Sequence, residues 1–214
     1  ETRLRDLVEA VRRAADDPRI IHMVIDPGFL RGIGLASLLE LEGAIEEFKE
    51  SGKPVIAIAD NLGQQQYLLA ALADEIWLNP KGVVWIDGFA AYRQFYRDGL
   101  DKLEVEVNLF RAGKYKSAFE PLIQNRPSPE TLEHYGEMER SLRMHLVETV
   151  ARGRGKDVNI VESWFKQAVF TPEDALTQGL IDELGYYVDS PHADKPKDDD
   201  EDFLLSTYNS AIGD

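Results

Sequence analysis

Two short apolar runs with a helix between them constrain the fold of this chain most. Residues 20–25 and 55–59 are nearly continuous in apolar and β-branched side chains, which is typical of strands covered on both faces. Between them, residues 38–48 carry apolar side chains at helical spacing, and Gly52 follows as a helix-ending residue. A strand, a helix and a second strand in this order predict a β-α-β unit with parallel strands.

The same alternation continues along the chain. The sequence predicts helices over residues 4–15, 64–73 and 92–103 and strands over residues 75–78, 83–86 and 105–109. Ser128 and Pro129 are typical of a helix start and predict a long helix that reaches Val150. Thr171 and Pro172 repeat the signal before a short helix that Gly179 ends. We therefore expect an α/β fold with helices flanking a largely parallel sheet.

Composition divides the chain into three segments. Residues 1–189 have the length and apolar content of one main domain. Residues 190–202 are rich in Pro, Lys and Asp, too polar to pack, and are predicted to be an acidic linker. Residues 203–214 return to strand-like composition and are expected to lead into a further, missing half. The absence of an initiating Met also favours a piece of a longer protein.

Charge and residue content exclude several functions. A net charge of -15 and a sequence pI near 4.7 oppose a nucleic-acid partner, because phosphate binding needs clustered Lys and Arg. The chain has no cysteine, so disulfides and thiol catalysis are excluded. The four histidines show no metal spacing, and neither a metal nor a cofactor is expected. No apolar run approaches the length that spans a bilayer, so any membrane anchor is expected outside this chain.

The segment from Ala59 to Pro80 predicts a strand that turns into a helix and ends in Ala-Asp-Glu-Ile followed by Pro80. It resembles the nucleophile segment of the signal peptide peptidases and of their ClpP and crotonase relatives. In those peptidases it reads A-S-G-G-Y-Y, and counting back from Asp74 places the serine at position 64. Gln64 stands there instead. Because an amide is a poor nucleophile, this position is not expected to perform acyl transfer.

A second motif, Phe110 to Pro121, resembles the general-base motif F-R-x-G-x-Y-K-S-A-x-E-P at every specified position. It is the motif of the long, duplicated signal peptide peptidase A (protease IV) family. Carried over residue by residue, the resemblance implies that the catalytic base is Lys116, whereas Lys114 falls on a variable position. A general-base lysine must be neutral at working pH, although the usual pKa is about 10.4, and burial among apolar groups lowers such a pKa.

A glycine-containing turn follows the first strand, at Gly28, Gly32 and Gly34. In the relatives a P-G-G-like turn supplies backbone N–H groups for an oxyanion hole. Here Phe29 stands where the second glycine is expected, and a turn that needs a permissive backbone explains the glycines equally well. The spacing also departs from the Gly-x-Gly-x-x-Gly pattern of dinucleotide sites.

These resemblances imply the amino-terminal half of a ClpP/crotonase-like serine endopeptidase that degrades cleaved signal peptides. In that family the amino-terminal half supplies the lysine and the carboxyl-terminal half supplies the serine of a Ser-Lys dyad. The implied partners are peptide substrates, the chain's own carboxyl-terminal half and further copies in a homo-oligomer. The implied location is the periplasmic face of the bacterial inner membrane. The isolated chain is expected to be inactive.

Two alternatives remain open from the residues. A crotonase-type enzyme acting on an acyl-CoA would share the fold but would not need the lysine motif. A non-catalytic scaffold half would explain the departures at Gln64 and Phe29, whereas Lys116 opposes that interpretation for a full-length protein.

Overall fold

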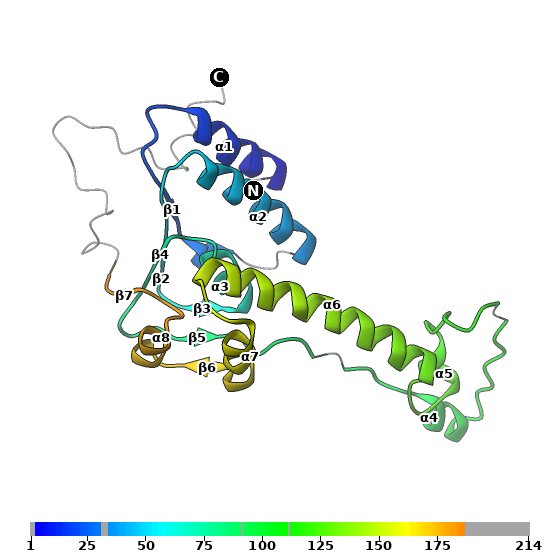
Figure 1. Cartoon of the computed structure of the whole chain (residues 1–214). Coiled ribbons are helices and arrows are strands. Elements are labelled where there is room, and N and C mark those ends of the chain that lie inside the picture. Colours follow the sequence, from blue (N-terminus) through cyan, green and yellow to red (C-terminus); the bar gives the residue numbers. More distant parts are fainter. Residues whose placement is uncertain (1–2, 31–33, 91, 111, 187–214) are drawn as a thin grey trace. The chain divides into compact units, whose positions relative to one another are not determined.

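The computed structural model describes residues 3–30, 34–90, 92–110 and 112–186 of the 214-residue chain (Figure 1). The helices are α1 (Leu4–Asp16), α2 (Leu35–Glu50), α3 (Gln64–Ala70), α4 (Arg97–Lys102), α5 (Glu120–Ile123), α6 (Pro129–Arg154), α7 (Val158–Gln167) and α8 (Pro172–Gln178), with a 3-10 turn η1 (Pro27–Phe29). The strands are β1 (Met23–Ile25), β2 (Val55–Ala59), β3 (Leu62–Gly63), β4 (Glu75–Leu78), β5 (Val84–Trp85), β6 (Val169–Phe170) and β7 (Glu183–Leu184). The chain divides into two compact units, one formed by residues 1–87 and 147–214 and the other by residues 88–146.

The main sheet of the first unit is entirely parallel, in the order β1-β2-β4-β7. Met23 pairs with Val55, and Ile56 pairs with Glu75 in the next strand. Every residue of β2 is buried, as the continuous apolar run predicted. The edge strand β1 is shorter than the predicted 20–25 and only partly buried. The expected α/β fold with a largely parallel sheet flanked by helices is confirmed.

A second, smaller sheet has the order β3-β5-β6, with β3 parallel to β5 and β5 antiparallel to β6. Each of these strands has two residues. The sequence predicted β5 as residues 83–86 but gave no signal for β3 or β6, because two residues are too few to show a strand's periodicity. Of its strands, β3 lies directly before α3 in the chain, so its pairing with β5 fixes where that helix begins.

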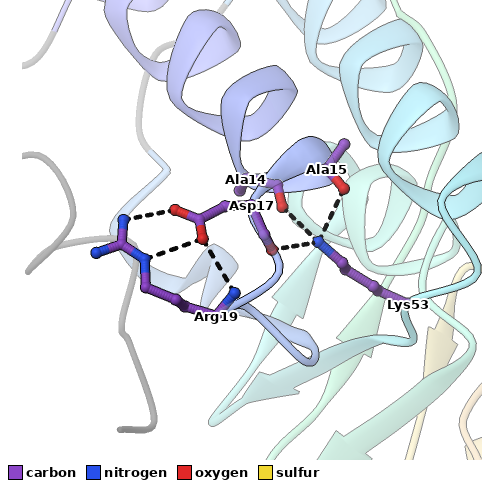
Figure 2. Close-up of polar contacts among 5 residues, drawn as sticks. All are labelled: Ala14, Ala15, Asp17, Arg19 and Lys53. Atoms are coloured by element: carbon purple, nitrogen blue, oxygen red, sulfur yellow. Dashed lines mark hydrogen bonds and ion pairs between the residues drawn. The ribbon is translucent and has the colours of Figure 1, made fainter.

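Helices α1 and α2 pack against each other in the first unit. Lys53, just after α2, donates hydrogen bonds from its ammonium group to the carbonyl oxygens of Ala14 and Ala15, both at 2.8 Å (Figure 2). It also reaches the carbonyl of Asp17 at 2.7 Å. The last carbonyls of a helix have no partner within the helix, so this lysine closes the end of α1.

The core of the first unit combines the sheet with aromatic side chains from three helices and one short strand. Phe48 of α2, Tyr67 of α3, Trp164 of α7 and Phe170 of β6 are all fully buried. The Tyr67 hydroxyl donates to the carbonyl of Leu180 at 2.9 Å. Burial raises the pKa of Tyr67, so this phenol stays neutral and serves the packing of α3.

The second unit contains α4, α5 and the first part of α6. The predicted strand over residues 105–109 is wrong: residues 105–110 form neither helix nor strand. The physical reason is the lack of a neighbour, since none of the described residues of this unit forms a strand that could pair with it. The predicted helix over 92–103 is reduced to Arg97–Lys102.

The start signals predicted for the later helices are confirmed. The backbone N–H of Thr131 donates to the Ser128 hydroxyl at 3.2 Å, so Ser128 caps α6. The N–H of Asp174 donates to the Thr171 hydroxyl at 3.2 Å, and Gly179 ends α8 with a positive φ of 81°.

Several predictions fall partly or wholly beyond the described residues, among them the position of Gly32 in the glycine-containing turn. The end of the domain at 189, the linker 190–202 and the strand-like segment 203–214 all lie there and stay predictions. Among the helices of the described part of the chain, none combines the length and the apolar content that a bilayer-spanning helix requires.

Candidate active site

Gln64, at the position where the peptidases carry serine, is the first residue of α3. The small strand β3 ends at Gly63, so the chain passes from strand to helix at this point. The backbone N–H of Gly63 donates to the Gln66 side-chain oxygen at 2.8 Å, which helps to close the helix start. The predicted strand-turn-helix geometry is therefore present, with a half-buried Gln64 amide in place of a hydroxyl.

The turn after β1 is held by a side chain. Asp26 caps η1, and its carboxylate accepts a hydrogen bond from the backbone N–H of Gly28 at 2.8 Å. An oxyanion hole needs backbone N–H groups that are open to the substrate oxygen. The N–H of Gly28 is already occupied by a negative group, so in this arrangement it does not offer that site.

These two features lie together in the first unit. Helix α3 contacts η1, and both follow the carboxyl ends of the neighbouring parallel strands β1 and β2. In open α/β sheets, ligand sites form at that edge. The structure therefore brings the start of α3, with the amide of Gln64, close to the turn that holds the occupied N–H of Gly28.

Lys116 belongs to the second unit, in the segment between α4 and α5. The backbone N–H of Lys116 donates to the carbonyl of Gly113 at 3.4 Å, and Gly113 has a φ of 96°, which favours glycine. The Lys116 side chain is exposed in this chain, although a buried position was expected for a general base. The described residues of the second unit therefore do not bury this side chain, as a general base requires.

Lys114, the other lysine of the motif, lies against Tyr115. Its ammonium is 4.8 Å from the centre of the Tyr115 ring. The pKa of Lys114 is raised, first by a hydrogen bond with the Tyr115 side chain and then by its charge interactions. A raised pKa favours the protonated form and opposes a role as base. The assignment of the base to Lys116, rather than Lys114, stays a prediction.

The glutamate of the same motif, Glu120, is fully buried. Its carboxylate accepts hydrogen bonds from the hydroxyls of Ser128 at 2.6 Å and Thr131 at 2.8 Å, and from the backbone N–H of Ser128 at 3.3 Å. These groups belong to the first turn of α6, where the partial positive charge of a helix start favours an anion. The contacts fasten the segment that carries Lys116 to a 26-residue helix.

In the sequence, Glu120 is marked only as one letter of the motif, and Arg93 is not marked at all. The Arg93 guanidinium donates from Nη2 to the carbonyl of Ser117 at 2.9 Å. One feature of the sequence could have indicated that Glu120 is buried: Ser128, a residue typical of a helix start, follows it after a short loop. No such feature indicated the contact of Arg93, since its partner is a backbone carbonyl 24 residues away.

Comparison with known sequences identifies relatives. Residues 47–195 match peptidase family S49. The chain is 47% identical over 125 residues to Protease 4 of Haemophilus influenzae, covering 58% of this chain and 20% of that protein. It is 40% identical over 154 residues to Protease 4 of Salmonella typhi, covering 72% of this chain and 25% of that protein. The chain thus spans a quarter or less of the length of these two relatives.

Among solved structures, a mutant of the 1510-N membrane-bound stomatin-specific protease aligns with 84% of this chain and 72% of its own, with 15% identity and a TM-score of 0.47. An enoyl-CoA hydratase from Shewanella pealeana aligns with 85% of this chain and 57% of its own, with 10% identity and a TM-score of 0.47.

Proposed function

This chain belongs to peptidase family S49, and from that premise we propose that it is the lysine-bearing, amino-terminal half of a signal peptide peptidase. The observation that carries the proposal is the division of the two motifs. The base motif is complete around Lys116, whereas the nucleophile position holds Gln64. A serine would then come from a carboxyl-terminal half, which the much greater length of the relatives accommodates.

The proposed reaction is hydrolysis of a peptide bond by a Ser-Lys dyad. The neutral amine of Lys116 takes the proton of the serine hydroxyl, and the oxygen attacks the peptide carbonyl. Backbone N–H groups stabilise the resulting oxyanion, and the lysine ammonium returns the proton to the leaving amine. Water then releases the acyl group from the serine by the same base-assisted steps.

The surface of the second unit supports a role within a larger assembly. Among its described residues, Leu146 is the only buried apolar side chain. Tyr92 and Phe110 are each 97% exposed, and Phe119, next to the base motif, is 55% exposed. Apolar surface of this extent is typical of an interface. We propose that the chain's own carboxyl-terminal half, in a homo-oligomer, covers this surface and desolvates the base.

Cleaved signal peptides are the proposed substrates, because exposed apolar side chains of this kind can bind an extended apolar peptide. The proposed location is the periplasmic face of the bacterial inner membrane, with the anchor outside the described residues. The S49 match favours this peptidase over the acyl-CoA alternative. For the chain alone, Gln64 and the occupied N–H of Gly28 favour the scaffold alternative.

The test compares the two lysines of the motif, Lys114 and Lys116, which are both exposed. In the full-length protein, Lys116→Ala should lower kcat/KM for a signal-peptide substrate by at least about 100-fold, the usual effect of losing a general base. Lys114→Ala should keep most of the activity. Equal losses at both positions would show that the base is misassigned.

A further inference from the structure

The segment that carries Lys116 is fastened from two directions, by Glu120 and by Arg93. We propose that these two side chains are positioning residues that fix Lys116 for proton transfer. The inference rests on the proposed function, because it assigns a role relative to the lysine base. In this proposal neither residue contacts the substrate, and each acts by holding the backbone beside Lys116.

The first fastening is the buried carboxylate of Glu120. A carboxylate without exposure to water is costly unless several donors satisfy it, and here three donors from Ser128 and Thr131 do so. All three belong to the start of α6, a long and regular support. Because Glu120 lies only four residues after Lys116, fixing this carboxylate limits how far the lysine backbone can move.

The second fastening is Arg93. Its Nη2 donates to the carbonyl of Ser117, the residue that directly follows Lys116, at 2.9 Å. The guanidinium carbon lies 5.9 Å from the centre of the Tyr135 ring of α6, so the same side chain is itself held by that helix. The two anchors therefore connect the lysine segment to α6 through independent contacts.

Precise placement matters for a general base. Proton transfer requires the nitrogen within hydrogen-bond reach of the serine hydroxyl, and a displacement of about 1 Å can cost about 100-fold in rate. An exposed segment between two short helices would otherwise sample many conformations. The contacts of Glu120 and Arg93 restrict that sampling before any substrate binds.

The kinetic experiment uses the full-length protein and a signal-peptide substrate. Glu120→Gln removes the charge and one acceptor oxygen, and we expect kcat to fall about 10- to 100-fold with KM changed less than about twofold. Arg93→Lys keeps the charge but shortens the donor reach, and we expect a smaller loss in kcat of the same kind. Glu137→Gln, an exposed position on the same helix, is the matched control and should behave as wild type.

A second experiment measures proteolysis of this chain by trypsin and does not require peptidase activity. Trypsin cleavage after Lys114 and Lys116 is measured relative to cleavage after Lys81, which lies in the other unit. Because Glu120→Gln should free the segment, cleavage after Lys114 and Lys116 should become about 10-fold faster in that variant but not in Glu137→Gln. Thr131→Val, which removes one donor and keeps the side-chain shape, should give a smaller increase.

The outcomes separate the two proposals. Unchanged cleavage rates in Glu120→Gln, or an unchanged kcat, would overturn the positioning role. A loss that appears equally in KM and in thermal stability would show a structural role and would overturn it as well. A fully active Lys116→Ala protein would instead overturn the proposed function, whatever the trypsin result.

Discussion

The ammonium group of Lys53 lies 2.7 Å from the carbonyl oxygen of Asp17, and thereby joins the segment after α2 to the end of α1 (Figure 2). The same ammonium also binds the carbonyls of Ala14 and Ala15. Three carbonyls that α1 cannot satisfy internally thus share one cation. The packing of α1 on α2 depends on this contact as well as on the apolar faces of the two helices.

Replacing Lys53 by Met should destabilise the first unit. The substitution keeps the apolar stem but removes the donor and the charge at the helix end, and we expect a loss of about 1–2 kcal/mol in the free energy of unfolding. Urea denaturation followed by circular dichroism measures it. Lys81→Met, at an exposed turn, is the control. A Lys53→Met protein as stable as that control would contradict the prediction.

Because of Asp17, the free energy of unfolding should depend on pH in the acid range. Its carboxylate binds the Arg19 side chain at 2.7 and 3.0 Å and the Arg19 backbone N–H at 3.0 Å (Figure 2). The Arg19 side-chain hydrogen bonds, and then the backbone one, lower the pKa of Asp17 from 3.8 to about 2. A lowered folded-state pKa means that the contribution is complete above about pH 5, well above the ordinary value of 3.8, and is lost as the pH falls through about 2.

The measurement is a comparison of wild type with Asp17→Asn by denaturation at a series of pH values. The difference in unfolding free energy should be constant above about pH 5 and should shrink between about pH 4 and pH 2. NMR titration of the Asp17 carboxyl carbon gives the pKa directly. A midpoint near 3.8, the ordinary value, would refute the assigned interaction.

Gly153 should not tolerate a side chain. A Cβ at this position of α6 would lie 1.9 Å from the carbonyl oxygen of Ala71, at the end of α3. We expect Gly153→Ala to cost about 1–3 kcal/mol, because the backbone of Ala71 must move. Gly136→Ala on the same helix meets nothing within 4 Å and should stabilise the protein by up to about 1 kcal/mol. Thermal unfolding of the two variants should therefore shift in opposite directions.

The isolated chain should have no peptidase activity. Gln64 is not a nucleophile, and Ser117, the serine next to Lys116, is adjacent in sequence and so is not expected to face it. The assay is turnover of a fluorogenic peptide ester, with the Lys116→Ala chain as the blank. Turnover that Ser117→Ala abolished would show that this chain carries its own nucleophile.

Local signals in the sequence determined a large part of the structure. The buried run 55–59 became β2 with those bounds, because a strand in the middle of a parallel sheet is apolar on both faces. Ser128 and Gly179 marked helix ends because capping depends on nearby backbone groups alone. The resemblance to the signal peptide peptidase A family likewise rested on contiguous motifs, and the match of residues 47–195 to peptidase family S49 confirms it.

Tertiary structure decided what depends on distant partners. The alternating residues 105–109 formed no strand because a strand needs a neighbour to pair with, and the described part of the second unit provides none. Asp26 occupies the N–H of Gly28, and Glu120 is buried against Ser128 and Thr131. A sequence pattern records which groups can form hydrogen bonds, whereas only the folded chain determines which of them meet and which are left in water.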